Sequence, residues 1–159
     1  MLTRDEAREI DEERGHYPDD QAALIDALKV VQRHRGWVSD DGVRDIAEHF
    51  GMSTATVDNV ATFYNLIFRH EVGEHVILLC DSVSCWLTGY EDLRAKLEER
   101  LGVRFGETTE DGRFTFLPMC CLGACDHAPV LMVDEDLHRD VTPDRVDEVL
   151  DRYSAGAES

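Results

Sequence analysis

Apolar residues recur at helical spacing through about the first 70 residues of the chain. Gly36 and Gly51 end the first two apolar stripes, and Ser53 stands where a third helix needs its N-cap. An acidic leading helix is expected over residues 3–14. We therefore predict a helical bundle that forms a first domain, residues 1–70. Its stripes are Leu24, Leu28 and Val31, then Val43, Ile46, Ala47 and Phe50, then Val57, Val60, Ala61 and Tyr64.

After residue 71 the pattern changes to short apolar runs separated by helical stretches. The first run is continuous, which is typical of a strand buried on both faces. Strands are expected at residues 76–79, 114–117, 130–133 and 138–141. One helix is predicted from Trp86, Tyr90, Leu93, Leu97 and Leu101, and a last one from Val146, Val149, Leu150 and Tyr153. These elements predict a mixed β-sheet domain, residues 71–159, and an α/β (α+β) fold.

Cysteines directly follow two of the predicted strands. Cys80 ends the first strand with Cys85 soon after it, and Cys121 and Cys125 follow the second strand. A strand, a helix and another strand in succession favour a right-handed crossover, which leaves both strands parallel with their carboxyl ends on one sheet edge. The two cysteine pairs are therefore expected to meet at that edge, where open sheets bind ligands.

The charge balance narrows the classes of partner. The chain carries 34 acidic and 16 basic residues, a formal net charge of −18. Binding to nucleic acid or to anionic membrane surfaces is electrostatically opposed. The sequence has no apolar run of about 18 residues and no basic-then-apolar start, so we expect a soluble, cytoplasmic protein without direct membrane insertion.

The cysteines point to a metal cluster. Five cysteines in a chain without an export signal favour metal or redox chemistry over disulfides, because cytosolic thiols are kept reduced. Two irons bridged by two sulfides need four thiolates, which two cysteine pairs supply. The cysteine loops can also offer backbone N–H groups to an anionic cluster, and Gly123 permits a left-handed turn in the second loop. We expect one 2Fe-2S cluster.

Several alternatives stay open on the residues alone. A structural zinc site could use the same four cysteines, and the chain would then be a zinc-stabilised interaction module. A thiol exchanger is less favoured because the usual Cys-x-x-Cys is absent. His127 could replace a cysteine as ligand, although a supporting or surface role suits it better. Either Cys120 or Cys121 could close a pair with Cys125.

Several motifs together resemble a known family, the thioredoxin-like 2Fe-2S ferredoxin subunit of NADH:quinone oxidoreductase, respiratory complex I. The resemblance covers nearly the whole chain. Its most specific part is the four-cysteine pattern with a long central gap, Cys80-Asp-Ser-Val-Ser-Cys85 and Cys121-Leu-Gly-Ala-Cys125, followed by Ala128-Pro129. Residues 61–64, Ala-Thr-Phe-Tyr, are similar to a motif that closes the family's helical part.

The resemblance implies both a ligand set and a role. Cys80, Cys85, Cys121 and Cys125 would be the ligands and Cys120 would not, in a helical bundle followed by a thioredoxin-like sheet. The cluster would exchange single electrons with FMN on a partner subunit that also binds NADH, next to other peripheral-arm subunits. The chain would then be a redox subunit that binds no substrate itself, at the inner face of the cell membrane through the complex. This agrees with the sequence, in which no Gly-x-Gly-x-x-Gly fingerprint follows a strand.

The main functional alternative is an equivalent ferredoxin subunit of another NAD-linked complex. Similar ferredoxin subunits occur beside a flavin subunit in NAD-linked hydrogenases and formate dehydrogenases. The aromatic residues Phe63, Tyr64 and Trp86 could contact such partners, but their helical spacing favours packing in the core.

Overall fold

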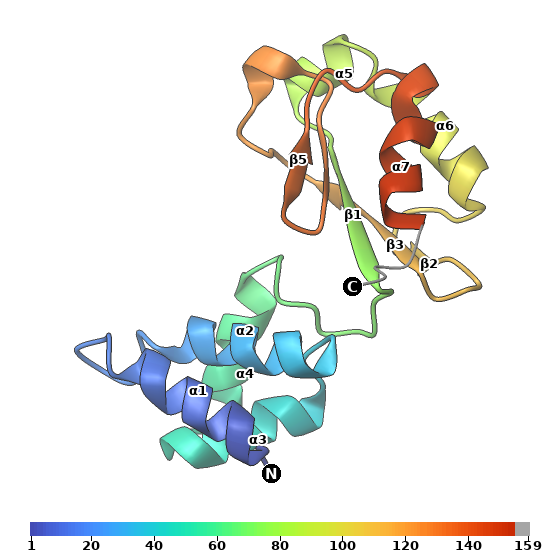
Figure 1. Ribbon diagram of the computed structural model, residues 1–159. Coiled ribbons are helices and arrows are strands. Elements are labelled where there is room, and N and C mark those ends of the chain that lie inside the picture. Colours follow the sequence, from blue (N-terminus) through green and yellow to red (C-terminus); the bar gives the residue numbers. More distant parts are fainter. Residues whose placement is uncertain (155–159) are drawn as a thin grey trace. The chain divides into compact units, whose positions relative to one another are not determined.

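The computed structural model describes residues 1–154, and its contacts divide between Glu71 and Val72 into two compact units (Figure 1). Each unit has a hydrophobic core of its own. None of the helices formed by the described residues is long and apolar enough to cross a bilayer. The α/β character expected from the sequence is confirmed: helices alone build the first unit, and a mixed sheet with helices builds the second.

Three of the four helices described in the first unit begin at side-chain caps, whereas the helix that begins at Leu24 has none. Thr3, Ser39 and Ser53 each accept a hydrogen bond from the backbone N–H three residues further on. The predicted apolar stripes are buried except at Val60, which is half-buried, and Tyr64, which is exposed. Leu28 and Val57 are fully inaccessible to solvent. The helices are α1 (Arg4–Arg14), α2 (Leu24–Arg35), α3 (Asp40–Phe50) and α4 (Thr54–Phe63).

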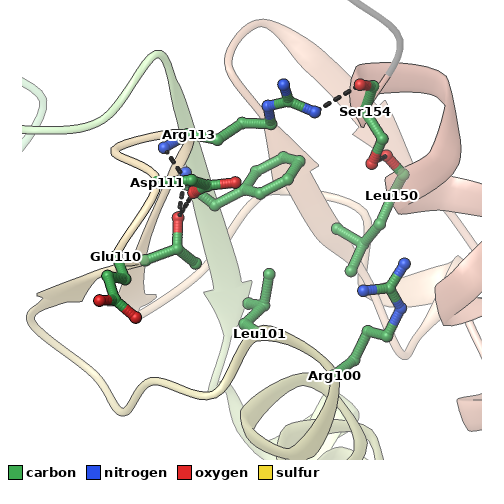
Figure 2. Close-up of a pocket in the computed structure, with 9 residues that line it drawn as sticks. Arg100, Leu101, Glu110, Asp111, Arg113, Leu150 and Ser154 are labelled. Atoms are coloured by element: carbon green, nitrogen blue, oxygen red, sulfur yellow. Dashed lines mark hydrogen bonds between the residues drawn. The ribbon is translucent and has the colours of Figure 1, made fainter.

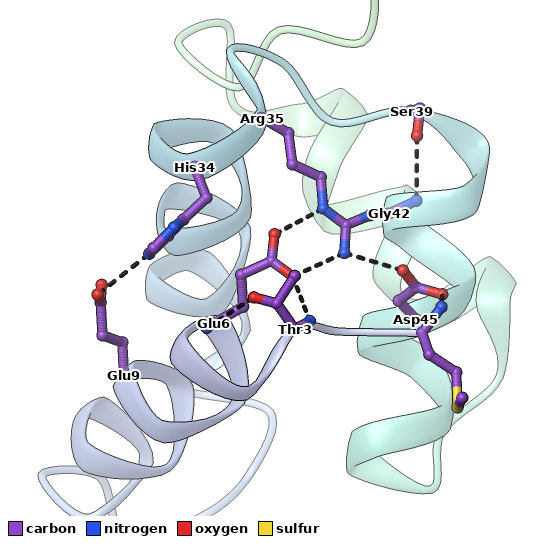
Figure 3. Close-up of polar contacts among 9 residues, drawn as sticks. Thr3, Glu6, Glu9, His34, Arg35, Ser39, Gly42 and Asp45 are labelled. Atoms are coloured by element: carbon purple, nitrogen blue, oxygen red, sulfur yellow. Dashed lines mark hydrogen bonds and ion pairs between the residues drawn. The ribbon is translucent and has the colours of Figure 1, made fainter.

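A buried carboxylate ties three of these helices together (Figure 3). Glu6 of α1 is 1% exposed and accepts two hydrogen bonds from the Arg35 guanidinium of α2, at 2.6 and 2.8 Å. The same guanidinium lies 2.9 Å from Asp45 of α3. The hydrogen bonds from Arg35 outweigh the effect of burial and lower the pKa of Glu6 to about 2. Because an unpaired buried charge is costly, this network favours one alignment of α1, α2 and α3.

The end of α4 differs from the prediction. The helix stops at Phe63, and Tyr64 is its C-cap in an extended conformation. The side chains of Phe63 and Tyr64 are 80% and 43% exposed, so the expected core packing of this pair is wrong. Phe63 follows buried Ala61 by two residues, which places it on the opposite side of the helix, and the helix ends before it can carry Tyr64 to the buried face.

The second unit contains a five-stranded sheet in the order β2-β3-β1-β4-β5. The strands are β1 (His75–Cys80), β2 (Glu107–Thr108), β3 (Phe114–Met119), β4 (Leu131–Val133) and β5 (Asp136–His138). β1 and β3 are parallel, as predicted, and the other neighbours are antiparallel. Every residue of β1 after His75 is buried, which confirms a central strand covered on both faces.

Helices of the second unit pack on this sheet. They are α5 (Val83–Leu87), α6 (Tyr90–Leu101) and α7 (Val146–Ser154), with short 3-10 turns η1 (Cys125–His127) and η2 (Pro143–Arg145). α6 and α7 contact each other on one side of the sheet (Figure 1). Leu93 and Leu97 of α6 and Leu150 of α7 are buried there with Phe116 of β3 in one cluster.

The single helix expected around residues 86–101 is in fact two. Gly89 has φ of +120°, a conformation that side-chain-bearing residues rarely adopt, and it separates α5 from α6. Trp86 therefore does not continue the buried side of α6, and its side chain is 57% exposed. The expectation that Trp86 packs in the core is wrong for this reason.

The sheet edges also differ from the prediction. Asp134 has φ of +54°, so the chain reverses within two residues and Val133 pairs directly with Asp136. The fourth predicted strand therefore lies at Asp136–His138 and not at residues 138–141. β2 was not predicted, because its two exposed residues carry no apolar pattern.

Candidate metal centre

The sheet brings the two cysteine segments together at the carboxyl ends of β1 and β3. In the parallel register Cys80 lies opposite Met119. The backbone N–H of Asp81 then donates to the Met119 carbonyl oxygen at 2.9 Å. Cys121 follows Met119 by two residues, so both segments leave the sheet side by side. The expected convergence on one edge is confirmed at the level of the backbone.

The first pair of thiols is buried. Cys80 and Cys85 are each 1% exposed and belong to the hydrophobic cluster of the second unit. The backbone N–H of Cys80 donates to the Val130 carbonyl oxygen at 3.2 Å, which anchors the end of β1 to the chain before β4. α5 begins three residues after Cys80 and turns Cys85 back toward the interior. This half of the site is therefore shielded from water.

The second pair lies at the surface. Cys121 and Cys125 are exposed, and their Sγ atoms are 3.8 Å apart. The backbone N–H of Gly123 donates to Cys121 Sγ at 3.4 Å. Gly123 has φ of +78°, so the predicted left-handed turn is present and closes the loop of three residues between the thiols.

The thiol of Cys80 faces donors from both loops. Burial works against its ionisation, but hydrogen bonds from the Ser82 hydroxyl, the Ser82 backbone and the Leu122 backbone outweigh burial, so the pKa of Cys80 is lowered. Leu122 belongs to the second cysteine loop, and η1 in the same segment contacts α5. The two loops thus approach each other around the Cys80 sulfur.

The pKa of the Cys85 thiol is shifted in the opposite direction. Burial is the largest influence and raises the pKa of Cys85, while a hydrogen bond from the Val130 backbone opposes the rise. The neighbouring sulfur of Cys80 raises the pKa of Cys85 further, and the Ser82 hydroxyl lowers it. Both thiols of the buried pair therefore interact with the same hydroxyl group, that of Ser82.

The remaining candidates sit beside the pairs. Cys120 is exposed and adjoins Cys121. The ring of His127 faces carboxylates: Nδ1 lies 3.0 Å from Asp140 and Nε2 lies 3.5 Å from Asp126. The backbone N–H of Asp140 also donates to the His127 carbonyl oxygen at 2.9 Å, so this histidine holds η1 against the chain before η2.

Two pairs of thiols fit the needs of a two-iron cluster. Within residues 1–154, no three His, Cys, Asp or Glu side chains surround a common point; the cysteines lie instead as two pairs. A 2Fe-2S cluster takes four thiolates, two on each iron, and its anionic charge requires hydrogen-bond donors. The backbone N–H of Leu122 faces the sulfur of Cys80, and that of Gly123 faces the sulfur of Cys121, as the expected donor role of this loop requires.

The contact of the Ser82 side chain was not predicted from the sequence. Ser82 was expected only to belong to a loop that offers backbone donors, whereas its Oγ lies 3.4 Å from Cys80 Sγ. The available signal was a serine two residues after a candidate ligand, at a position suited to an N-cap.

A separate hollow lies away from the thiols (Figure 2). It has a volume of about 590 Å³ and lies between the ends of α6 and α7 and the turn before β3. Its arginines already have partners: Arg100 pairs with Asp147 at 2.7 Å, and Arg113 donates to the Ser154 carbonyl oxygen. The hollow borders the amino end of β3, whereas the cysteines lie at the carboxyl end.

Comparison with curated proteins finds relatives that match along almost the entire chain. The chain is 51% identical over 152 residues to an NADH-quinone oxidoreductase subunit from Salmonella typhimurium, covering 96% of this chain and 92% of that protein. The protein of the same name from Escherichia coli is 50% identical with the same coverage. That from Pseudomonas aeruginosa is 48% identical over 153 residues, again covering 96% and 92%.

A solved structure supports the fold, and a family model covers the site. The NAD+-reducing NiFe hydrogenase in its H2-reduced state superposes with a TM-score of 0.71 at 20% identity, over 84% of this chain and 22% of that chain. At that identity the likeness concerns the fold alone. The model of the thioredoxin-like 2Fe-2S ferredoxins matches residues 10–154, a range that contains all five cysteines. With two thiol pairs at one sheet edge, donors facing their sulfurs and this match, the chain belongs to the thioredoxin-like 2Fe-2S ferredoxin family.

Proposed function

We propose that this chain is the electron-transfer subunit of an NADH-quinone oxidoreductase, and that Cys80, Cys85, Cys121 and Cys125 ligate its cluster. The observation that carries the ligand assignment is the joining of the two cysteine segments by backbone hydrogen bonds at one sheet edge. The three bacterial relatives, about half identical over 96% of the chain and named as parts of that oxidoreductase, support the wider assignment.

The buried and the exposed cysteine pairs would have different roles in holding the cluster. When bound, a 2Fe-2S cluster supplies a centre that takes up and releases one electron at a time. Buried Cys80 and Cys85 would hold it on the protein side and exclude water there. Exposed Cys121 and Cys125 would hold it on the side that a redox partner can approach. Cys120 would be a spare thiol.

The partner we propose is a subunit that binds FMN and NADH, with other peripheral-arm subunits nearby, at the inner face of the cell membrane. The chain itself carries no dinucleotide fingerprint, so hydride chemistry would take place on the partner. The helical unit, residues 1–70, and the ferredoxin domain, residues 71–159, would be its two domains. A hydrogenase subunit is less favoured, because the likeness to the hydrogenase structure has 20% identity and concerns the fold only.

Two experiments test this proposal. The full chain, expressed with iron and sulfide, should be red-brown and give an EPR signal only after reduction. A colourless, EPR-silent protein with zinc would contradict the cluster. Isolation of the native assembly should then recover a flavin subunit, and NADH should reduce the cluster rapidly only when that subunit is present. Reduction by NADH without the flavin subunit would contradict the proposed electron path.

A further inference from the structure

Ser82 is the N-cap residue of α5, but among the described residues its side chain makes no capping hydrogen bond. Its backbone is extended, with φ of −64° and ψ of 162°, and its carbonyl oxygen accepts the first helical bond from the Trp86 N–H at 2.8 Å. Thr3 and Ser39 have nearly the same backbone angles. Both turn their hydroxyl oxygen to a backbone N–H of the first turn. Ser82 makes no such bond with any described residue.

The hydroxyl of Ser82 is directed at sulfur instead. Its Oγ lies 3.4 Å from Cys80 Sγ, within reach of a hydrogen bond to that atom. A protonated Cys80 can be the donor in this contact. A ligating thiolate has no proton, so the hydroxyl must then donate and the sulfur accept. A side chain that usually stabilises a helix start is therefore available to a ligand of the metal centre.

We propose that Ser82 is a positioning residue that donates a hydrogen bond to the Cys80 thiolate of the bound cluster and thereby stabilises its reduced form. The inference rests on the proposed function, since it requires Cys80 to be a ligand. Reduction adds one negative charge to the cluster, and a donor to a ligand sulfur is more favourable with the more negative state. The hydroxyl should therefore raise the reduction potential.

The expected effect is that of one hydrogen bond to one ligand sulfur. Its removal should lower the equilibrium constant for reduction about fivefold, which is about 40 mV for a one-electron couple. This shift is separable from cluster assembly, because four thiolates hold the cluster and one hydrogen bond only biases its charge state.

The test compares reduction potentials of the full chain by EPR-monitored redox titration. Ser82→Ala should retain the reduced-state EPR signal and shift the potential to more negative values, whereas Ser82→Thr, which keeps a hydroxyl, should remain near the wild-type value. Ser84→Ala is the matched control, because the Ser84 hydroxyl has no hydrogen bond to any residue within 1–154. It should leave the potential unchanged.

The outcomes separate this inference from the proposed function. An unchanged potential in Ser82→Ala, with the cluster present, overturns the role of Ser82 and leaves the ligand assignment standing. A wild-type chain that binds no cluster overturns the proposed function itself. If Ser82→Ala assembles no cluster, the test compares Ser82→Thr with Ser82→Val, which have nearly the same shape. A reduction potential that is more negative in the valine variant than in the threonine variant supports the inference. Equal potentials in that pair, or failure of the valine variant alone to assemble, overturn it.

Discussion

The backbone N–H of Asp81 donates to the carbonyl oxygen of Met119 at 2.9 Å, which extends the pairing of β1 and β3 one residue beyond Cys80. The two thiol-bearing segments are thus held together by the main chain of the sheet. Loss of one thiol at the surface should therefore remove the cluster and leave the fold intact.

The first prediction compares two exposed cysteines. Cys125→Ala should lose nearly all of the stoichiometric cluster, because one iron would lack a thiolate and alanine offers no other donor. Cys120→Ala should retain it. Iron content and the EPR signal of the reduced chain measure the difference, and circular dichroism should be the same for both variants. Equal cluster loss in the two variants would contradict the assignment of Cys120 as the spare thiol.

The second prediction concerns helix caps in the chain without iron. Ser39→Ala should lower the free energy of unfolding by about 1 kcal/mol, because the Gly42 N–H loses its acceptor. Ser82→Ala should cost less than about 0.5 kcal/mol, because its hydroxyl caps nothing in the described structure. Urea unfolding followed by circular dichroism gives both values. A cost for Ser82→Ala as large as that for Ser39→Ala would argue that the hydroxyl caps α5 in solution.

The third prediction is a pH dependence from Glu6. Its pKa in the folded chain is about 2, below its ordinary value of 4.5, so the folded state binds this proton less readily than the unfolded state. Its stabilisation is therefore fully present above about pH 4.5 and is lost as the pH falls toward 2. A shift of this size corresponds to about 3 kcal/mol. Urea unfolding at pH steps from 7 to 2.5 measures it.

Two variants make that experiment specific. Glu6→Gln should be about 3 kcal/mol less stable than wild type at pH 7, and this gap should narrow below pH 4.5. Glu12→Gln in the same helix should follow the wild-type curve, because Glu12 is exposed and has no ion pair with any residue among 1–154. A gap for Glu6→Gln that does not change with pH would show that the carboxylate charge is not the cause.

The fourth prediction tests the exposed face of α5. Trp86→Ala should change the free energy of unfolding by less than about 0.5 kcal/mol, because the indole is 57% exposed. Leu93→Ala in α6, where the side chain is fully buried, should cost about 2–5 kcal/mol. Thermal unfolding of the iron-free chain compares them. A cost of several kcal/mol for Trp86→Ala would mean that the indole packs in the core after all.

The fifth prediction concerns a close approach of main chain at Gly73. A Cβ atom there would lie 2.8 Å from the Gly112 carbonyl oxygen and 2.9 Å from the Arg113 carbonyl carbon. Both are backbone atoms, so the main chain just before β1 must shift to make room. Gly73→Ala should therefore destabilise the second unit by about 1–3 kcal/mol. Amide hydrogen exchange should rise at His75 and Thr115. Unchanged protection in the alanine variant would refute the clash.

Much of the framework was predictable because it depends on local pattern. The stripes that include Leu28 and Val57 repeat at the helical period, and a helix with one apolar face must bury that face. The parallel pairing of β1 and β3 followed from a strand-helix-strand order, for which one hand of crossover dominates. The end of α4 and the break at Gly89 were not predicted. A helix that ends one residue earlier, or that is interrupted at one residue, leaves the next side chain in solvent, and the apolar pattern does not reveal this.

The sequence by itself determined the helical bundle, the central buried strand and the two cysteine pairs, because periodicity and spacing are properties of neighbouring residues. Only the tertiary structure decided that Cys80 and Cys85 are buried while Cys121 and Cys125 are exposed, since burial depends on segments that are distant in the chain. It also decided the partner of the Ser82 hydroxyl. A serine at a helix start can bond to backbone or to sulfur, and the choice depends on which acceptor the fold places within reach.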